Sequence, residues 1–421
     1  MNIKIAFDFH DIFVNSHEAW IKAFSEFTDN ENIIIDYKNK VSKKEICKKY
    51  NLDYENIEKT YRNYLEKIDK NIEFAEKLSH WYEIDIISMA RKDRLLKDIE
   101  KFNLNHIFEN VYGKEQVLNR EEYLQKLSKK YDWVVFFNHE YKDIIEKENI
   151  VYIPIDFQGN LSEYKNISFT EHAKNKLLYN DLSKYYMQAI VNDTNIETNF
   201  IKKLFNKYLN KNTGKILDCC CGVGRHDYLL GKDGFEVTGI DISSKQIETA
   251  KKIHNNKNVE YEVMDVRNIN LEEKDYDMSI CMWTTYNYLS LDKDFEKFIK
   301  SNYNHQKTGS ILILDSKNIP KLEKRRVYKR NSYIDNVMNM ELIVNKFIIG
   351  NIQNSQYFYF IKESNEKKFL FDQEFVRFYK LSEIKKLTEN YYEVIDIYGD
   401  FDMEEYRENE SNRFIVILKR K

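Results

Sequence analysis

The alternation of hydrophobic and polar positions predicts a first series of strands and helices in the N-terminal part of the chain. Short apolar runs at Ile3–Phe7, Ile84–Ile87 and Trp133–Phe137 are separated by segments with helical periodicity. The segment after the first run is long, about residues 15–78, and its pattern is helical. This order predicts a βαβ-type parallel sheet that carries a helical cap.

A second series begins at about residue 176. Its apolar runs are separated by segments long enough for crossover helices, which implies parallel strands. Strand-rich runs follow Asp315, and two final strands are expected at Tyr392–Tyr398 and Arg413–Leu418. The predicted parallel strands are Lys215–Cys219, Glu236–Ile240, Val259–Met264, Met278–Met282 and Ser310–Asp315.

These patterns predict an α/β protein with two Rossmann-like parallel-sheet domains. The first domain covers about residues 1–150 and has the helical cap. The second covers about residues 176–421, contains an antiparallel insertion and ends in a reversed hairpin. Weak periodicity at residues 151–175 predicts a linker, and a chain of 421 residues is long enough for two or three domains.

Composition and charge narrow the classes of function. The 66 Lys and Arg residues nearly balance the 69 Asp and Glu residues, and a net charge of −3 argues against a dedicated nucleic-acid binder. No apolar run approaches the ~18 residues needed to cross a bilayer, and the first residues do not resemble a signal peptide. Three of the five cysteines are consecutive, which fits a reducing compartment. We expect a cytoplasmic protein with a small-molecule substrate and no nucleic-acid or membrane partner; the oligomeric state stays open.

Glycines and strand-end carboxylates gather in the second domain. The strand that ends in Asp218 leads through Gly222 and Gly224 into a helix, so that main-chain N–H groups can face a polar ligand. The next strand ends in Asp241, where a carboxylate can accept both ribose hydroxyls of a nucleoside. A third strand ends near Asp265, which can take an exocyclic amine. The arrangement indicates a site for a cofactor that contains a nucleoside.

Two cofactor classes fit this arrangement, a dinucleotide and S-adenosylmethionine. The third glycine of a dinucleotide fingerprint would stand at Asp227, which disfavours NAD. A Rossmann-like domain without a nucleotide is the structural alternative.

The pattern Asp218-x-x-x-Gly222-x-Gly224-Arg-His, with the later strand-end carboxylates and the run Met282-Trp-Thr-Thr-Tyr286, resembles class I S-adenosylmethionine-dependent methyltransferases. The resemblance covers about residues 176–421 and points to the small-molecule branch. One departure is Cys220, because the family usually has glycine there. The cofactor-binding residues that the resemblance implies are Tyr186 in the lead-in lid, Asp218, Gly222, Gly224, Asp241, Asp265 and Met282.

The acceptor side is less specific. Tyr286 follows the fourth strand, where it could position or deprotonate an acceptor; the alternative is a pocket wall. Arg377 could pair with a carboxylate or phosphate of the substrate, or it could be a solvated charge. The basic run 321–330 could steer an anionic acceptor, or it could be a solvated face. No Asn-Pro-Pro-Tyr-like motif is present, which disfavours methylation of DNA bases.

Three strand ends of the first domain carry another set of polar residues. Asp8 follows the first strand, Ser88 the second, and the loop after the third contains Asn138, His139 and Asp143. With a helical cap after the first strand, this set resembles the haloacid dehalogenase superfamily over residues 1–150.

That resemblance implies roles in phosphoryl transfer. Asp8 matches the nucleophile and a metal ligand, Asp143 a second metal ligand, and Ser88 the phosphate-binding hydroxyl. Lys114 or Arg120 could replace the family's lysine. His10 stands where the family has an acid/base aspartate; because Mg²⁺ prefers oxygen ligands, a normal magnesium site is impaired. His10 as a general acid, or a softer divalent metal, are the alternatives.

The sequence therefore predicts an S-adenosylmethionine-dependent methyltransferase of a small metabolite, phosphorylated or sugar-like, with a degenerate or altered phosphatase-like domain. One alternative is a bifunctional phosphatase and methyltransferase. Another is a non-catalytic, cofactor-sensing interaction protein.

Overall fold

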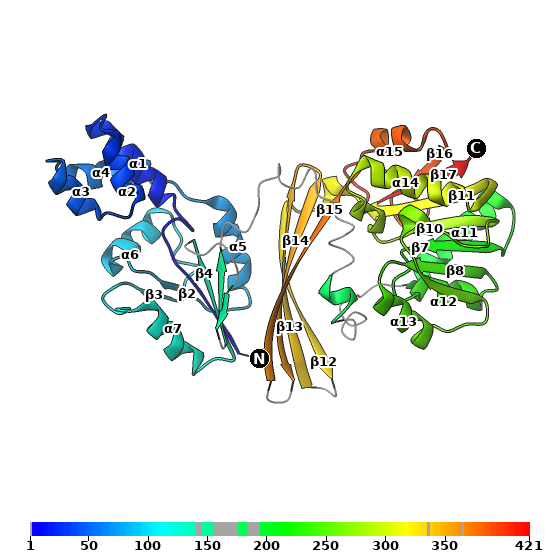
Figure 1. The fold of residues 1–421 in the computed structure, drawn as a ribbon, viewed down its shortest axis with the longest axis horizontal. Coiled ribbons are helices and arrows are strands. Elements are labelled where there is room, and N and C mark those ends of the chain that lie inside the picture. The colour runs from blue at the N-terminus through cyan, green and yellow to red at the C-terminus, as the bar shows by residue number, and fades with distance from the viewer. Residues whose placement is uncertain are drawn as a thin grey trace. The chain divides into compact units, whose positions relative to one another are not determined.

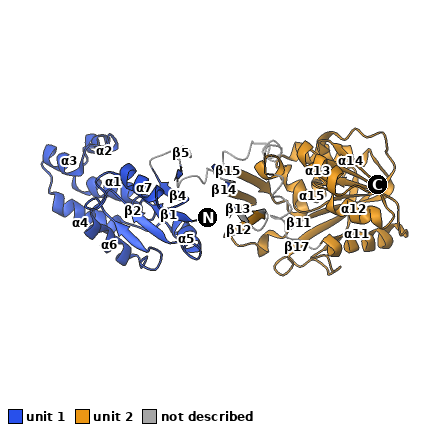
Figure 2. Ribbon diagram, turned by 90° about the horizontal axis from the view of Figure 1, so that it is seen from below, with its two compact units in different colours: residues 1–159, 338–341, 360–369 blue, residues 160–337, 342–359, 370–421 orange. Residues whose placement is uncertain are grey.

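The computed structural model describes most of the chain: residues 2–139, 145–147, 149–154, 176–182, 194–334, 337–363 and 366–421. The chain divides into two units, which Figure 2 colours separately. The first consists of residues 1–159, 338–341 and 360–369, and the second of residues 160–337, 342–359 and 370–421. The fold class is α/β, as predicted.

The first unit is built on a six-stranded sheet in the order β3-β2-β1-β4-β6-β5. Every neighbouring pair is parallel except β5 and β6. Because the strands are parallel, Asp8 and Ser88 follow neighbouring strands at the same edge. The strands are β1 (Ile3–Phe7), β2 (Ile84–Ile87), β3 (Asn110–Tyr112), β4 (Trp133–Asn138), β5 (Ile145–Lys147) and β6 (Ile150–Pro154).

Helices fill the long segment between β1 and β2, as the sequence predicts. The first four gather apart from the strands in Figure 1, whereas α5 (Asp69–Ser79) packs against β2. Helix α3 begins at a capping box formed by Ser42 and Glu45. The cap helices are α1 (Ser16–Phe27), α2 (Glu31–Lys38), α3 (Lys43–Lys49) and α4 (Tyr54–Tyr64), and the later helices of this unit are α6 (Lys92–Lys101) and α7 (Arg120–Ser128).

The second unit contains a seven-stranded sheet in the order β16-β17-β11-β10-β7-β8-β9. The five predicted parallel strands are present, and β17 runs antiparallel to both β11 and β16, which is the predicted reversed hairpin. The strands are β7 (Lys215–Cys219), β8 (Glu236–Asp241), β9 (Val259–Val263), β10 (Tyr276–Cys281), β11 (Gln306–Lys317), β16 (Tyr392–Tyr398) and β17 (Arg413–Arg420).

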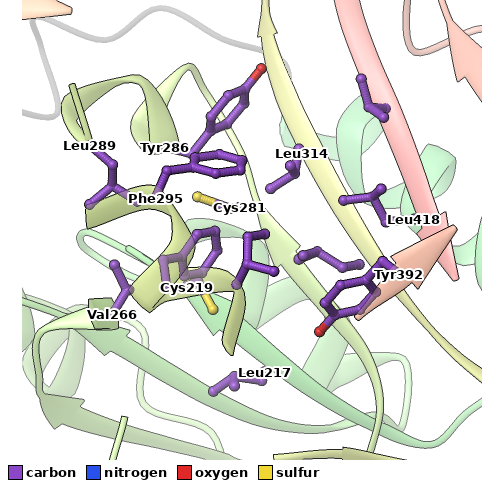
Figure 3. Close-up of a cluster of buried hydrophobic side chains, with 14 of the residues drawn as sticks. Leu217, Cys219, Val266, Cys281, Tyr286, Leu289, Phe295, Leu314, Tyr392 and Leu418 are labelled. Carbon is purple, nitrogen blue, oxygen red and sulfur yellow. The ribbon is translucent and has the colours of Figure 1, made fainter. Parts of the chain in front are cut away.

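Helices connect these strands. Figure 3 shows part of the apolar core of this sheet, a cluster of buried side chains that includes Leu217, Cys219, Cys281 and Phe295 of α14. No helix within the described ranges has the length and apolar character needed to cross a bilayer. The helices of this unit are α11 (Thr194–Leu209), α12 (Arg225–Lys232), α13 (Ser244–Ile253), α14 (Asp292–Tyr303) and α15 (Leu381–Thr388).

A four-stranded sheet is inserted between β11 and α15 (Figure 1). Three of its strands correspond to predicted strand-rich runs. The fourth, β12, coincides with the basic run 321–330, for which no strand was predicted. The strands are β12 (Arg325–Ile334), β13 (Val337–Ile349), β14 (Ile352–Glu363) and β15 (Glu366–Arg377).

Candidate functional site

A cavity of about 310 Å³ lies at the carboxyl ends of the strands of the seven-stranded sheet, and all its lining residues belong to the second unit. Residues of β12, β13, β14 and β15 line the rest of its wall. Tyr186 lies outside the described residues, and Gly224 is not part of the lining. The predicted site residues that line the cavity are Asp218, Gly222, Asp241, Asp265, Met282 and Tyr286.

The turn between β7 and α12 is built on left-handed backbone conformations. Gly222 and Gly224 have φ angles of 57° and 72°, and Cys220 has 69°. A Cβ atom at Gly224 would lie 2.2 Å from the Tyr261 hydroxyl, so the close approach of this turn to β9 requires glycine. The positive φ of Cys220 gives the physical reason why glycine is usual there in the family that the sequence resembles.

Asp241 ties this turn to the end of β8. One carboxylate oxygen accepts a hydrogen bond from the Gly222 N–H at 2.9 Å, and the other accepts one from the Ser243 N–H at 2.8 Å. Burial raises the pKa of Asp241 to about 6, although both N–H groups favour the charged form. Each oxygen keeps acceptor capacity for a second donor, such as a ribose hydroxyl in the cavity.

Asp218 and Asp227 form a buried carboxyl pair beneath the turn. Burial raises the pKa of Asp218, and burial together with the neighbouring Asp218 raises the pKa of Asp227 further. Asp227 is therefore the member that keeps a proton. Asp227 is the O–H donor beside Asp218, whereas one oxygen of Asp218, a cavity-lining residue, has no N–H donor within the described part of the chain. This orphaned acceptor suits an ammonium group in the cavity.

Asp265 lines the cavity, but its carboxylate already has a partner. Arg267 donates to it at 2.6 Å and also lies 3.4 Å from Asp294. The predicted contact with an adenine amine would therefore use the acceptor capacity that remains beside Arg267.

Tyr286 stands on the 3₁₀ turn Thr285–Tyr288 and is 1% exposed. Its ring packs against Phe295 and Tyr379, and its hydroxyl meets the Ser316 side chain without a well-formed hydrogen bond. Burial raises the pKa of Tyr286, so the phenol keeps its proton at neutral pH. This supports a role in positioning rather than in deprotonation.

Arg377 does not line the cavity. Its guanidinium donates to Asp292 at 2.7 Å, to Glu383 at 2.5 Å and to the main-chain oxygen of Ser290 at 2.9 Å. These contacts hold the end of β15 against the starts of α14 and α15. The structure thus gives the arginine that was predicted to bind substrate a structural role, because two carboxylates neutralise it.

Several cavity residues carried no signal in the sequence. Lys176 forms a buried ion pair with Glu374, and Glu374 also accepts hydrogen bonds from Tyr288 at 2.7 Å and Tyr357 at 3.2 Å. Burial lowers the pKa of Lys176 to about 7. Lys176 and Glu374 are 198 positions apart in the chain, so no local spacing could have joined them.

In the first unit, the structure brings Asp8 and Arg120 together. Asp8 is buried, and one of its oxygens lies 2.9 Å from Arg120. Of the two basic residues that the sequence offered for this place, Arg120 is therefore the one in contact. His10 lies 3.4 Å from Asp98, and Ser88 is buried, its hydroxyl accepting from the Ala90 N–H.

Of the two predicted metal ligands, the structure describes only Asp8. Asp143 lies outside the described residues. Within the part of the chain that the structure describes, no three His, Cys, Asp or Glu side chains are grouped so as to hold a metal ion. The metal in the first unit stays a prediction.

Comparison with known proteins agrees with the geometry of the cavity. The family model described as a methyltransferase domain matches residues 216–309, which include the turn after β7 and Asp241. YqeM of Bacillus subtilis (strain 168), named as a methyltransferase, is 32% identical over 103 residues, 24% of this chain and 42% of YqeM. The chain thus spans less than half the length of that relative.

A second relative matches over more of its length. GWCH70_2453 of Geobacillus sp. (strain WCH70), also named as a methyltransferase, is 22% identical over 242 residues, which are 56% of this chain and 97% of the relative. A solved S-adenosylmethionine-dependent methyltransferase from Clostridium acetobutylicum ATCC 824 aligns with a TM-score of 0.48 and 20% identity, covering 57% of this chain and 98% of that one.

Residues 216–309 of the second unit therefore match a methyltransferase domain, and both relatives are named as methyltransferases. S-adenosylmethionine is the cofactor that the resemblance of the sequence implies for this unit. The cavity fits that cofactor, because it presents a carboxylate with spare acceptor capacity, an orphaned buried oxygen and a glycine turn.

Proposed function

We propose that the chain transfers a methyl group from S-adenosylmethionine to a small metabolite bound in the cavity of the second unit. The observation that carries this proposal is Asp241, whose carboxylate lines the cavity and is fixed by two main-chain N–H groups. When bound, S-adenosylmethionine supplies an electrophilic methyl group on a sulfonium.

At the cofactor end, Asp241 accepts the ribose hydroxyls and Asp218 accepts the ammonium group of the methionine part. Asp265 and Met282 line the adenine side, and the turn at Gly222 allows the backbone to approach the ligand closely. Tyr186, which lies outside the described residues, stays a predicted cofactor contact. These assignments rest on the resemblance and on the positions of the described residues around one cavity.

At the acceptor end, the protein's task is to orient the nucleophile and to exclude water. Tyr286 keeps its proton and can donate a hydrogen bond to the acceptor. The Lys176–Glu374 pair lines the same cavity, where Tyr288 and Tyr357 hold Glu374 in place. Glu374 is the carboxylate of this wall that we expect to accept a hydrogen bond from an amine or hydroxyl acceptor, because it lines the same cavity.

The test is turnover. The full chain is incubated with S-adenosylmethionine and a panel of small amines, hydroxy compounds and their phosphorylated forms, and release of S-adenosylhomocysteine is measured. Acceptor-dependent release that Asp241→Ala abolishes supports the proposal. Cofactor binding without release for any acceptor favours the cofactor-sensing alternative.

For the first unit, we propose a haloacid dehalogenase-like domain. Its sheet includes β6, so this domain extends at least to Pro154, beyond the predicted boundary at about residue 150 and into the predicted linker at 151–175. The contact between Asp8 and Arg120, with Ser88 at the neighbouring strand end, supports this proposal. Because His10 replaces a carboxylate, we expect the domain to be degenerate or to use a metal other than magnesium.

Hydrolysis of p-nitrophenyl phosphate by the full chain tests this second proposal. Turnover with magnesium is expected to be very low, and any rescue should come from manganese, zinc or iron. Robust magnesium-dependent turnover that is lost in Asp8→Asn would contradict degeneracy and favour a bifunctional enzyme.

A further inference from the structure

Strand β12 places basic side chains on the wall of the cavity. Along this strand, Arg325 and Val327 are buried, whereas Tyr328 and Arg330 line the cavity. Lys346 of β13 lines it as well. The basic run 321–330 thus contributes two residues to the cavity wall, and some of its other basic side chains, such as Lys324 and Arg326, are exposed to solvent.

Three cations converge on the ring of Tyr328. The guanidinium carbons of Arg326 and Arg330 lie 5.2 and 5.3 Å from the ring centroid, and the Lys346 ammonium lies 5.8 Å from it. Lys346 is also 5.9 Å from the ring of Tyr357. Two aromatic faces therefore help to hold positive charge that is brought together on one wall.

Lys317, at the end of β11, extends this group toward the segment 283–286, which we call the acceptor loop. Its main-chain N–H donates to the Thr284 hydroxyl at 3.2 Å, two residues before Tyr286. Burial and the positive charges of Lys346, Arg413, Arg326 and Arg330 lower the pKa of Lys317 to about 7. Like charges this close repel one another unless an anion lies among them.

These cations differ from others around the cavity in having no carboxylate partner. Lys176 is paired with Glu374, and Arg225 with Glu197. By contrast, within the described part of the chain no ion pair is formed by the three basic residues Lys317, Arg330 and Lys346, which line the cavity, or by their neighbour Arg326. The other basic residues of the cavity have carboxylate partners, whereas Lys317, Arg330 and Lys346 have none among the residues that the structure describes. This difference indicates that an anionic ligand neutralises these three residues.

We propose that Lys317, Arg330 and Lys346 bind a phosphoryl group of the methyl acceptor, and that this contact sets which metabolites the enzyme accepts. The proposal rests on the proposed function, because it concerns the acceptor end of the same cavity. Burial and neighbouring cations lower the pKa of Lys317 to about 7 and that of Lys346 to about 8, so a bound anion is what keeps all three residues charged together. A group that carries two negative charges does this better than a single carboxylate, which favours a phosphoryl group. The main chain of Lys317 is hydrogen-bonded to Thr284 of the acceptor loop. A metabolite whose phosphoryl group binds Lys317 would therefore lie next to this loop.

Calorimetric titration of the full chain with inorganic phosphate tests this subsite without any methyl transfer. Saturable binding is expected for the wild type, and Lys346→Gln and Arg330→Gln should each weaken it about tenfold, because each removes a charged hydrogen-bond donor. Lys324→Gln is the matched control, since Lys324 is exposed and does not line the cavity. The control should bind phosphate as the wild type does.

A parallel titration with S-adenosylmethionine separates this proposal from the proposed function. Arg330→Gln and Lys346→Gln should leave cofactor affinity unchanged, which also shows that the variants are folded. Absence of phosphate binding, equal loss in Lys324→Gln, or acetate binding as tightly as phosphate would overturn the phosphoryl subsite. Absence of cofactor binding would overturn the proposed function instead.

Discussion

Arg413 donates to both carboxylate oxygens of Asp315, at 2.6 and 2.5 Å, and both side chains are buried. Asp315 also accepts from the Trp283 N–H at 2.7 Å, and its main-chain oxygen accepts from the Thr284 N–H at 2.9 Å. Trp283 and Thr284 have φ angles of 63° and 66°, an uncommon conformation for bulky or β-branched residues. The ion pair thus holds the strained loop that leads to Tyr286.

Removing one member of this ion pair should destabilise the folded protein. We expect Arg413→Ala to lower the free energy of unfolding by about 3–5 kcal/mol, because it leaves the Asp315 charge buried and unpaired. Denaturant titration measures the loss. Arg407→Ala is the control, because the Arg407–Glu410 pair is exposed and should contribute no more than about 1 kcal/mol. Equal effects in the two variants would contradict the role of the pair.

The glycine turn gives a second prediction. Gly224→Ala should lower the free energy of unfolding by more than the ~1 kcal/mol of left-handed strain, since its new Cβ would also collide with the Tyr261 hydroxyl. Gly350→Ala is the matched control, because Gly350 also has a positive φ but nothing lies within 4 Å of the added atom. Thermal unfolding of the two variants should therefore differ, and similar midpoints would argue against the close approach.

Two buried tyrosines of one core should respond differently to loss of the hydroxyl. Tyr392 donates to Gln306 at 2.6 Å and accepts from Asn302 at 2.9 Å, so Tyr392→Phe should cost about 1–2 kcal/mol of stability. Tyr286→Phe should be nearly neutral, because the Tyr286 hydroxyl has no well-formed partner in the core. Denaturant midpoints of the two variants provide the comparison. A large loss in Tyr286→Phe would show that its hydroxyl serves the fold instead of the cavity.

The sequence allowed much of the fold to be predicted, because buried parallel strands are continuous apolar runs between helical segments. The three-residue strand β3 is too short to give such a signal. Strand β12 was missed because its cavity-facing positions, such as Tyr328 and Arg330, are aromatic and charged, so that the run lacked the alternation of a half-buried strand.

In the site too, local sequence patterns predict some residues, whereas other contacts depend on the tertiary fold. Asp241 could be predicted, because the ends of parallel strands meet at one edge of a sheet and a strand-end carboxylate must lie there. The pairings of Glu374 with Lys176 and of Arg413 with Asp315 could not, because they join segments that only the tertiary fold brings together. The charge of Arg377 suggested a ligand. Its pairing with Asp292 could not be predicted, because the two residues are 85 positions apart in the chain.

Cofactor affinity should depend on pH through Asp241. Burial raises the pKa of this carboxyl to about 6, so the protein loses the charged acceptor as the pH falls through 6. Affinity for S-adenosylmethionine should therefore decrease below pH 6 and be constant above about pH 7. The stability of the folded state depends on pH in the opposite direction. Folding raises the pKa of Asp241 from its ordinary 3.8 to about 6, so protonation favours the folded state; this contribution is complete below about pH 3.8 and is lost as the pH rises through 6. Calorimetry at several pH values checks this, and Asp241→Asn should remove the dependence.

The most direct test of the methyltransferase site is the affinity of Asp241→Ala for S-adenosylmethionine, measured by calorimetry at pH 7.5. Removing a carboxylate that accepts two ribose hydroxyls should weaken binding by roughly 2 kcal/mol or more, about thirtyfold. Asp275→Ala, an exposed aspartate outside the cavity, is the control and should bind as the wild type does. Unchanged affinity in Asp241→Ala would contradict the cofactor site.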